Sequence, residues 1–187
     1  MSGTEVDPLL LAAIETVKLE GRFDHNGNLA IYKLPDGDGG GSYEIAGIND
    51  KYHPEEFKKL SELPAEERAK EAARYIKEYT SPLVSKLPKV MQAFTQDLAF
   101  NRGMGGATRF IQKGLNALKI KVDVDGKIGP KTLEAINKVH SRALMQAMSQ
   151  AQLDYEYDLA YNDSSRKKFI AGLENRIRNR LFQFANS

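Results

Sequence analysis

Glu20 is the side chain in this sequence best suited to acid–base chemistry. It ends an amphipathic pattern that begins after Asp7-Pro8, and Gly21 follows it directly. At 100° per residue, Glu20 lies at the border of the apolar stripe, so we expect its carboxyl group to be partly desolvated. The carbonyl end of the helix also disfavours a negative charge there. Both effects favour the protonated carboxyl that a general acid needs, although an ordinary surface glutamate before a glycine cap gives the same pattern.

A polar, glycine-rich segment downstream of Glu20 supplies candidates for a second catalytic carboxyl group. Glycoside hydrolysis uses one carboxyl group to protonate the leaving oxygen and another to position water or stabilise positive charge. The candidates for the second group are Asp38, Asp36 and Glu44, and Ser42 is a candidate to help hold the water. The same run is also typical of a hairpin tip, and no Lys-Ser/Thr follows it as a phosphate-binding loop requires.

The segment from Asp125 to Thr132 is strongly patterned, but its residue types set backbone geometry and do not perform chemistry. Asp125-Gly126 suits a turn, Gly129 allows a close approach, and Pro130 suits the first position of a helix. We therefore expect this segment to be a scaffold that joins two helices.

Composition excludes several other classes of site. The chain has 187 residues, no cysteine, and three histidines without metal-ligand spacing, so we expect neither a metal site nor a cofactor. A net charge of +2 is too small to imply a nucleic-acid partner. A basic cluster near the end of the sequence is expected to be a solvated helix face, which could attract an anionic cell wall. Its members are Arg166, Lys167, Lys168, Arg176, Arg178 and Arg180.

The elements that must position these residues are mainly helical. Seven of the fifteen glycines lie at residues 21–47, where two or three short strands, including 29–32 and 42–45, predict a small β-hairpin flap. Helical spacing dominates elsewhere, and Ser81-Pro82 and residues 103–106 are expected to interrupt it. The expected helices cover residues 8–20, 64–79, 88–101 and 107–118, and a further helix is expected to start at 53–54. A long helix is expected over 130–161 with a break, followed by a last helix that is capped by Ser164 or Ser165 and ends near residue 184.

Six segments spread over most of the chain carry a family resemblance. They are Glu20-Gly21 after an amphipathic helix, the Asp/Gly-rich stretch ending at Gly47-Ile48, Asn101-Arg-Gly103, Asp125-Gly-x-x-Gly-Pro-x-Thr132, Tyr155-x-Tyr-Asp-Leu-Ala160 and Phe169-x-x-Gly172-Leu-x-Asn175-Arg176. Together they resemble glycoside hydrolase family 108, a lysozyme-like group of phage endolysins and bacterial muramidases. The resemblance implies one lysozyme-like domain over residues 1–187, with a catalytic helix and flap at 1–90 and a peptidoglycan-binding-type helical portion at 91–187 in the same core.

The resemblance also implies roles for individual residues. Glu20, which matches the acidic position of the family motif Glu-Gly-Gly, would be the catalytic general acid. Asp38 would orient water or stabilise the transition state, and Ser42 would help to hold the water. The residues implied to bind substrate are Tyr43, Glu44, Tyr52 and Asn101.

The chain departs from the family pattern in the flap, which leaves the second catalytic carboxyl group open. The departures are Arg22 at the second glycine, Gly39 for a proline, Ser42 for a threonine and Asn49 for a final threonine. Asp38 is the preferred alignment, and Asp36 and Glu44 are the alternatives. A separation of about 5 Å between the two carboxyl groups would indicate retention of configuration, and one of about 6.5–9.5 Å inversion.

The expected function is a muramidase that cleaves the β-1,4 bond between N-acetylmuramic acid and N-acetylglucosamine, and the alternative is a non-catalytic peptidoglycan-binding module. Peptidoglycan is the expected partner, with an immunity protein or a secretion apparatus as further candidates and no nucleic acid. No apolar run predicts membrane insertion, and no signal peptide is visible. We therefore expect action in the periplasm or cell wall after delivery by a holin, by a secretion system or as part of a larger protein.

Overall fold

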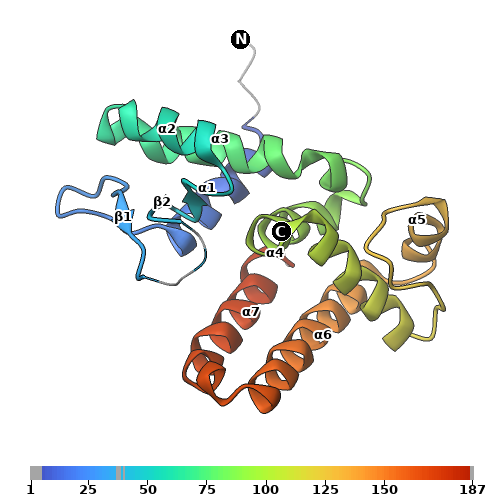
Figure 1. Ribbon diagram of the computed structural model, residues 1–187. Coiled ribbons are helices and arrows are strands. Elements are labelled where there is room, and N and C mark those ends of the chain that lie inside the picture. The colour runs from blue at the N-terminus through green and yellow to red at the C-terminus, as the bar shows by residue number, and fades with distance from the viewer. Residues whose placement is uncertain (1–5, 37–38, 40, 186–187) are drawn as a thin grey trace, which may run out of the picture. The chain divides into compact units, whose positions relative to one another are not determined.

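The computed structural model describes residues 6–36, 39 and 41–185. Over these residues the chain is mainly α-helical with a small antiparallel sheet near its N-terminal end, which confirms the predicted fold class (Figure 1). The chain divides into two compact units, residues 1–79 and 80–187. The prediction that both parts share one core stays a prediction. No helix within the described ranges is long and apolar enough to cross a membrane.

The first unit begins with helix α1, Pro8–Glu20, whose observed bounds are those predicted. Asp7 caps it, because its Oδ1 accepts hydrogen bonds from the backbone N–H groups of Leu9, at 3.0 Å, and Leu10, at 3.4 Å. Pro8 at the first helical position has no N–H to leave unsatisfied. Local chemistry at the start of the helix therefore determines where it begins.

The flap is a three-stranded antiparallel sheet of β1 (Tyr32–Lys33), β2 (Tyr43–Ile45) and β3 (Ile48–Asn49), in the order β1-β2-β3. Ile45 pairs with Ile48 across a two-residue turn, in which Ala46 and Gly47 both have positive φ, at 50° and 80°. The predicted strand at 29–32 is wrong in its bounds. Leu29 makes only an isolated bridge with Phe23, because Asp24 Oδ1 accepts two backbone hydrogen bonds that fold residues 24–28 into a separate turn.

Helix α2 covers Pro54–Glu62 and helix α3 covers Ala65–Val84, with the boundary between the two units inside α3. The prediction that Ser81-Pro82 ends this helix is wrong. Proline removes a single N–H from the helical ladder, and the last turn continues, with Ser85 N–H donating to the carbonyl of Ser81 at 3.1 Å. Leu83 and Val84 in that turn are buried, and their burial offsets the lost hydrogen bond.

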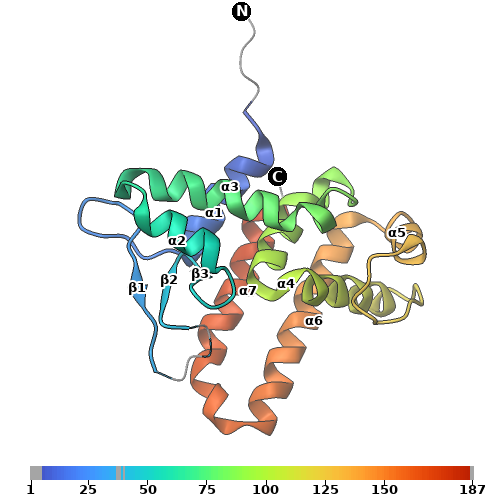
Figure 2. The same cartoon turned by 45° about the horizontal axis from the view of Figure 1, so that its top comes forward.

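The second unit contains α4 (Lys89–Ala117), α5 (Pro130–Ile136), α6 (Ser141–Asn162), a 3-10 helix η1 (Ser164–Phe169) and α7 (Ile170–Phe184). The interruption predicted at residues 103–106 is confined to Gly103, with φ 75° and ψ 157°, and the chain is helical on both sides of it. The predicted long helix from Pro130 breaks between α5 and α6. Figure 2 shows α6 and α7 side by side, joined at one end by η1.

The predicted capping residue of the last helical segment is also corrected. Asp163, and not Ser164 or Ser165, caps η1, because its Oδ1 accepts from the backbone N–H of Ser165 at 3.0 Å. An aspartate directly before two serines offers a stronger acceptor than either hydroxyl group, since it carries a charge. The core of this unit is mostly apolar, although it also encloses charged side chains such as Asp97 and Arg180. Its buried apolar residues include Met91, Phe94, Leu98, Ile111, Leu115, Leu144, Met148 and Ile177.

Candidate functional site

Glu20 is the last residue of α1 and is half-buried. The next residue, Gly21, donates its N–H to the carbonyl of Val17 at 2.7 Å. A Cβ atom on Gly21 would lie 2.6 Å from both Leu29 Cδ1 and the Val17 carbonyl oxygen, so only glycine fits there. The Glu-Gly pair therefore has a packing reason, because it lets Leu29 close directly over the helix end that carries Glu20.

Two arginines hold the segment that follows Glu20. The guanidinium of Arg22 lies 3.6 Å from the ring centroid of Tyr32, at the start of β1. Arg68 of α3 donates from Nη1 to the carbonyl of Leu29 at 3.2 Å and from Nε to the carbonyl of Leu60 at 3.1 Å. Both views show α1 beside the sheet within this unit (Figures 1 and 2). The contacts of Arg22 and Arg68 thus hold the segment between α1 and the flap in place within the first unit.

Asp50 organises the flap, and sequence reasoning missed it. Its Oδ1 accepts from the backbone N–H groups of Ser42, at 2.8 Å, and Tyr43, at 3.3 Å. This oxygen occupies the space of a side chain at Gly41, since a Cβ there would lie 2.1 Å from it, and Gly41 has a φ of 107°. The one signal in the sequence is an acidic residue directly after a short strand and a glycine two residues before its partner strand. That signal is shared by many turns.

The candidate residues of the flap lie in different settings. Asp38, the preferred second carboxyl group, lies outside the described residues, and Asp36 is exposed in the turn after β1. Glu44 is half-buried on β2, opposite Tyr32 and Asn49 in the strand register. Ser42 directly precedes β2, which begins with Tyr43 and Glu44, so the flap holds these three candidates in one short segment. Tyr43 and Tyr52 both expose much of their rings.

Asn101 belongs to the second unit, where it joins a buried ionic network. Its Oδ1 accepts from Nη2 of Arg180 at 3.2 Å, and Nη1 of Arg180 donates to Oε1 of Gln152 at 2.7 Å. Asp97 is fully buried and accepts from Arg180 Nε at 2.6 Å and from Arg176 Nη2 at 2.7 Å. The role of Asn101 in binding substrate stays a prediction.

This network corrects the expectation for the basic cluster. Arg176 and Arg180 do not form a solvated face, because both pair with Asp97, and the side chain of Arg180 is only 1% exposed. Burial by itself would raise the pKa of Asp97, but the charges of Arg180 and Arg176 and the hydrogen bonds they donate outweigh burial and lower it. Asp97 is therefore ionised, and it links α4 to α7.

The patterned segment at residues 125–132 is held by one amide side chain. Nε2 of Gln112 donates to Oδ1 of Asp125 at 2.8 Å, and Oε1 of Gln112 accepts from the N–H of Gly126 at 2.9 Å. Gly126 has a φ of 75°, and a Cβ there would lie 2.9 Å from the guanidinium carbon of Arg109. Pro130 is the first residue of α5, as predicted. These contacts fit the expected scaffold role.

Comparison with known proteins finds one family model that matches part of the second unit. Residues 106–178 match a protein-family model described as "Predicted Peptidoglycan domain". The match does not single out glycoside hydrolase family 108, and no curated protein matches the chain. Among solved structures, one titled "Structure of Brucella abortus SagA" aligns with a TM-score of 0.64 and 21% identity over 96% of each chain. That likeness shows a shared fold.

Proposed function

We propose that the protein is a peptidoglycan hydrolase, specifically an N-acetylmuramidase with Glu20 as its general acid. The observation that carries the proposal is the position of Glu20, half-buried at the end of α1 and directly before a glycine that packing requires. The peptidoglycan-related segment at 106–178 and the resemblance to glycoside hydrolase family 108 give the substrate class. Action in the periplasm or cell wall, by whichever delivery route, belongs to the same proposal.

In this mechanism Glu20 donates its proton to the glycosidic oxygen between N-acetylmuramic acid and N-acetylglucosamine as the C–O bond breaks. Water, oriented by the second carboxyl group, then attacks the positively charged sugar. As the new C–O bond forms, the water gives up a proton, to the second carboxylate in an inverting reaction or to the Glu20 carboxylate in a retaining one. Asp38 is the first candidate for that carboxyl group, and Asp36 and Glu44 are the alternatives. Asp50 fixes the backbone at Ser42 and so holds the flap in place for this step.

One observation favours a non-catalytic peptidoglycan-binding module as the second candidate. The family match falls on residues 106–178 and leaves out α1 and the flap. A binding module needs no proton donor, so Glu20 would then be an ordinary helix-terminal residue. The two candidates differ in a single measurable property, which is whether the protein breaks glycosidic bonds.

The deciding experiment compares clearing of a purified peptidoglycan suspension by the wild-type chain and by Glu20→Gln. We expect Glu20→Gln to fold normally and to lose about 10²–10⁴-fold in clearing rate, because an amide has no proton of suitable acidity to donate. Glu15→Gln is the matched control, since Glu15 lies on the same helix and pairs with Lys18 at the surface. Clearing at the wild-type rate by Glu20→Gln, with unchanged thermal melting, would exclude Glu20 from the mechanism. Absence of clearing by the wild-type chain, with retained binding, would favour the module.

A further inference from the structure

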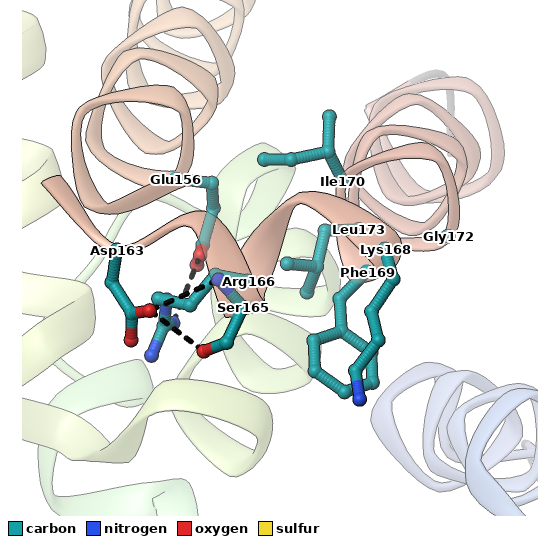
Figure 3. A pocket seen from close by; sticks show the side chains of 9 residues that line it. All are labelled: Glu156, Asp163, Ser165, Arg166, Lys168, Phe169, Ile170, Gly172 and Leu173. Atoms are coloured by element: carbon teal, nitrogen blue, oxygen red, sulfur yellow. Dashed lines mark hydrogen bonds and ion pairs between the residues drawn. The ribbon is translucent and has the colours of Figure 1, made fainter. Parts of the chain in front are cut away.

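A hollow of about 660 Å³ lies where α6, η1 and α7 meet, inside the peptidoglycan-related segment (Figure 3). Its lining combines two kinds of surface. Arg166, Lys168 and Asp163 bring charge, and Phe169, Ile170 and Leu173 bring apolar area. A hollow of this size, lined by both charged and apolar side chains, is suited to a short segment of a ligand.

Glu156 gives this hollow a buried acceptor. Its side chain is only 1% exposed, and neither carboxylate oxygen accepts a hydrogen bond from any residue that the structure describes. The oxygens lie in ion pairs, at 2.9 Å from Arg102 and 3.7 Å from Arg166, and Figure 3 shows the carboxyl group pointing towards Arg166. A carboxylate can accept about four hydrogen bonds, so Glu156 keeps capacity to accept them beside its two ion pairs. A ligand N–H or O–H group would therefore be stabilised here.

The hollow also offers charges of the opposite sign. Figure 3 shows Arg166 beside Glu156, with which it pairs at 3.7 Å, and Lys168 beside Phe169. A ligand carboxylate can pair with these two cations. Asp163 is already occupied, because its Oδ1 accepts from the backbone N–H of Ser165 at 3.0 Å and from its hydroxyl at 2.7 Å. Phe169 exposes 57% of its surface and supplies an apolar wall. The hollow thus presents an acceptor, two cations and an apolar surface within one small volume.

We propose that this hollow binds the peptide part of peptidoglycan. A short acidic peptide has amide N–H groups for Glu156, carboxylates for Lys168 and Arg166, and small apolar side chains for Ile170 and Leu173. A neutral chain of N-acetylated sugars has the N–H groups but no carboxylate, so it uses only part of the hollow. The inference rests on the peptidoglycan association in the proposed function, but it does not depend on catalysis by Glu20.

The test measures binding of a soluble disaccharide-tetrapeptide, purified from digested peptidoglycan, by isothermal titration calorimetry. We expect Lys168→Gln to weaken binding about tenfold, the size of one charge-assisted hydrogen bond, and Arg166→Gln to weaken it at least as much. Lys167→Gln is the matched control, because Lys167 lies on the same turn of η1 but lines a neighbouring hollow with Tyr157 and Tyr161. It should bind like the wild type.

Three results would overturn the proposal. One is unchanged binding by Lys168→Gln and Arg166→Gln when both melt like the wild type. Another is an equal loss in Lys167→Gln, which would indicate general attraction between charges. The third is equally tight binding of an uncharged tetramer of N-acetylglucosamine, which would make the hollow a glycan site. Calorimetry with the Lys168 and Arg166 variants reports on the hollow, and clearing by Glu20→Gln reports on catalysis, so failure of the hydrolase proposal and failure of this one give different results.

Discussion

The two units bury carboxyl groups in opposite ways. In the first unit Glu56 of α2 faces Glu71 of α3, and the two share nearby cations, with Lys59 Nζ 2.5 Å from Glu71 and Arg74 Nη2 3.9 Å from Glu56. In the second unit Asp97 has, among the residues that the structure describes, no second carboxyl group to share its cations with, and it receives two guanidinium groups, at 2.6 and 2.7 Å.

Burial and charged partners together set the pKa values of these carboxyl groups. Burial, together with the hydrogen bond and charge of Glu71, raises the pKa of Glu56 to about 7. Hydrogen bonds from Arg74 and Lys59 outweigh burial and hold the pKa of Glu71 at about 2. The pKa of Asp97 is lowered although the residue is more deeply buried than either. A buried carboxyl group with cations of its own, such as Asp97, thus carries charge, whereas one that shares its cations with a second carboxyl group, such as Glu56, holds its proton more strongly.

The largest effect is expected when the fully paired carboxylate is removed. Asp97→Asn leaves two buried or half-buried arginines without their counter-charge, and we expect it to lower the free energy of unfolding by about 3–5 kcal/mol. Urea unfolding measures this change. Glu134→Gln is the control, because it removes an exposed ion pair with Lys138 in the same unit and should leave stability almost unchanged. Equal losses in the two variants would mean that burial of the pair adds nothing.

A smaller effect, which depends on pH, is expected at Glu56. Between the ordinary glutamate pKa of 4.5 and about 7, the folded state holds a proton on Glu56 that the unfolded state has lost. The contribution of this group to stability is therefore fully present below pH 4.5 and is lost as the pH rises through 7. We expect Glu56→Gln to flatten this decline, so that the variant gains most over the wild type near pH 8. Thermal melting at pH 5 and pH 8 checks it, and an equal change at both values would contradict it.

The smallest effect is a shift in one titration. Glu71→Gln removes the like charge and the carboxylate hydrogen bond beside Glu56 but leaves Lys59 and Arg74 in place, so we expect the pKa of Glu56 to fall from about 7 towards its ordinary range. Carbon-detected NMR of the glutamate carboxyl groups measures that pKa directly. Glu55→Gln, at an exposed neighbouring position, should leave it unchanged. A pKa that stays near 7 in Glu71→Gln would show that burial alone raises it.

The sequence predicted elements well where the signal is local. Asp7-Pro8 and Glu20-Gly21 carry their own cap chemistry, and α1 has the predicted bounds. Helix α3 passes through Pro82 because burial of Leu83 and Val84 is a tertiary effect that proline rules do not contain. The sequence predicts an interruption at residues 103–106, and the structure limits it to Gly103.

In the candidate site, too, the sequence predicts local features but not tertiary contacts. The place of Glu20 at the end of its helix follows from spacing, and the packing reason for Gly21 appears only when Leu29 is seen against it. Asp50 acts on a strand eight residues earlier, and the ionic partners of Asp97 come from a different helix. Such long-range contacts give no periodic pattern in the sequence. For this reason the sequence predicts a solvated face for Arg176 and Arg180, whereas the structure pairs both with Asp97.

The ionic network of the second unit also bears on how the chain is made. Asp97 precedes Arg176 by 79 residues and Arg180 by 83. At about 5–20 residues per second, a ribosome needs roughly 4 to 16 seconds to reach these arginines after it has added Asp97. Helix α4 cannot bury Asp97 with its counter-charges during that time. The second unit therefore completes its core only once α7 has left the exit tunnel, and until then the nascent chain depends on whatever shields its apolar surface.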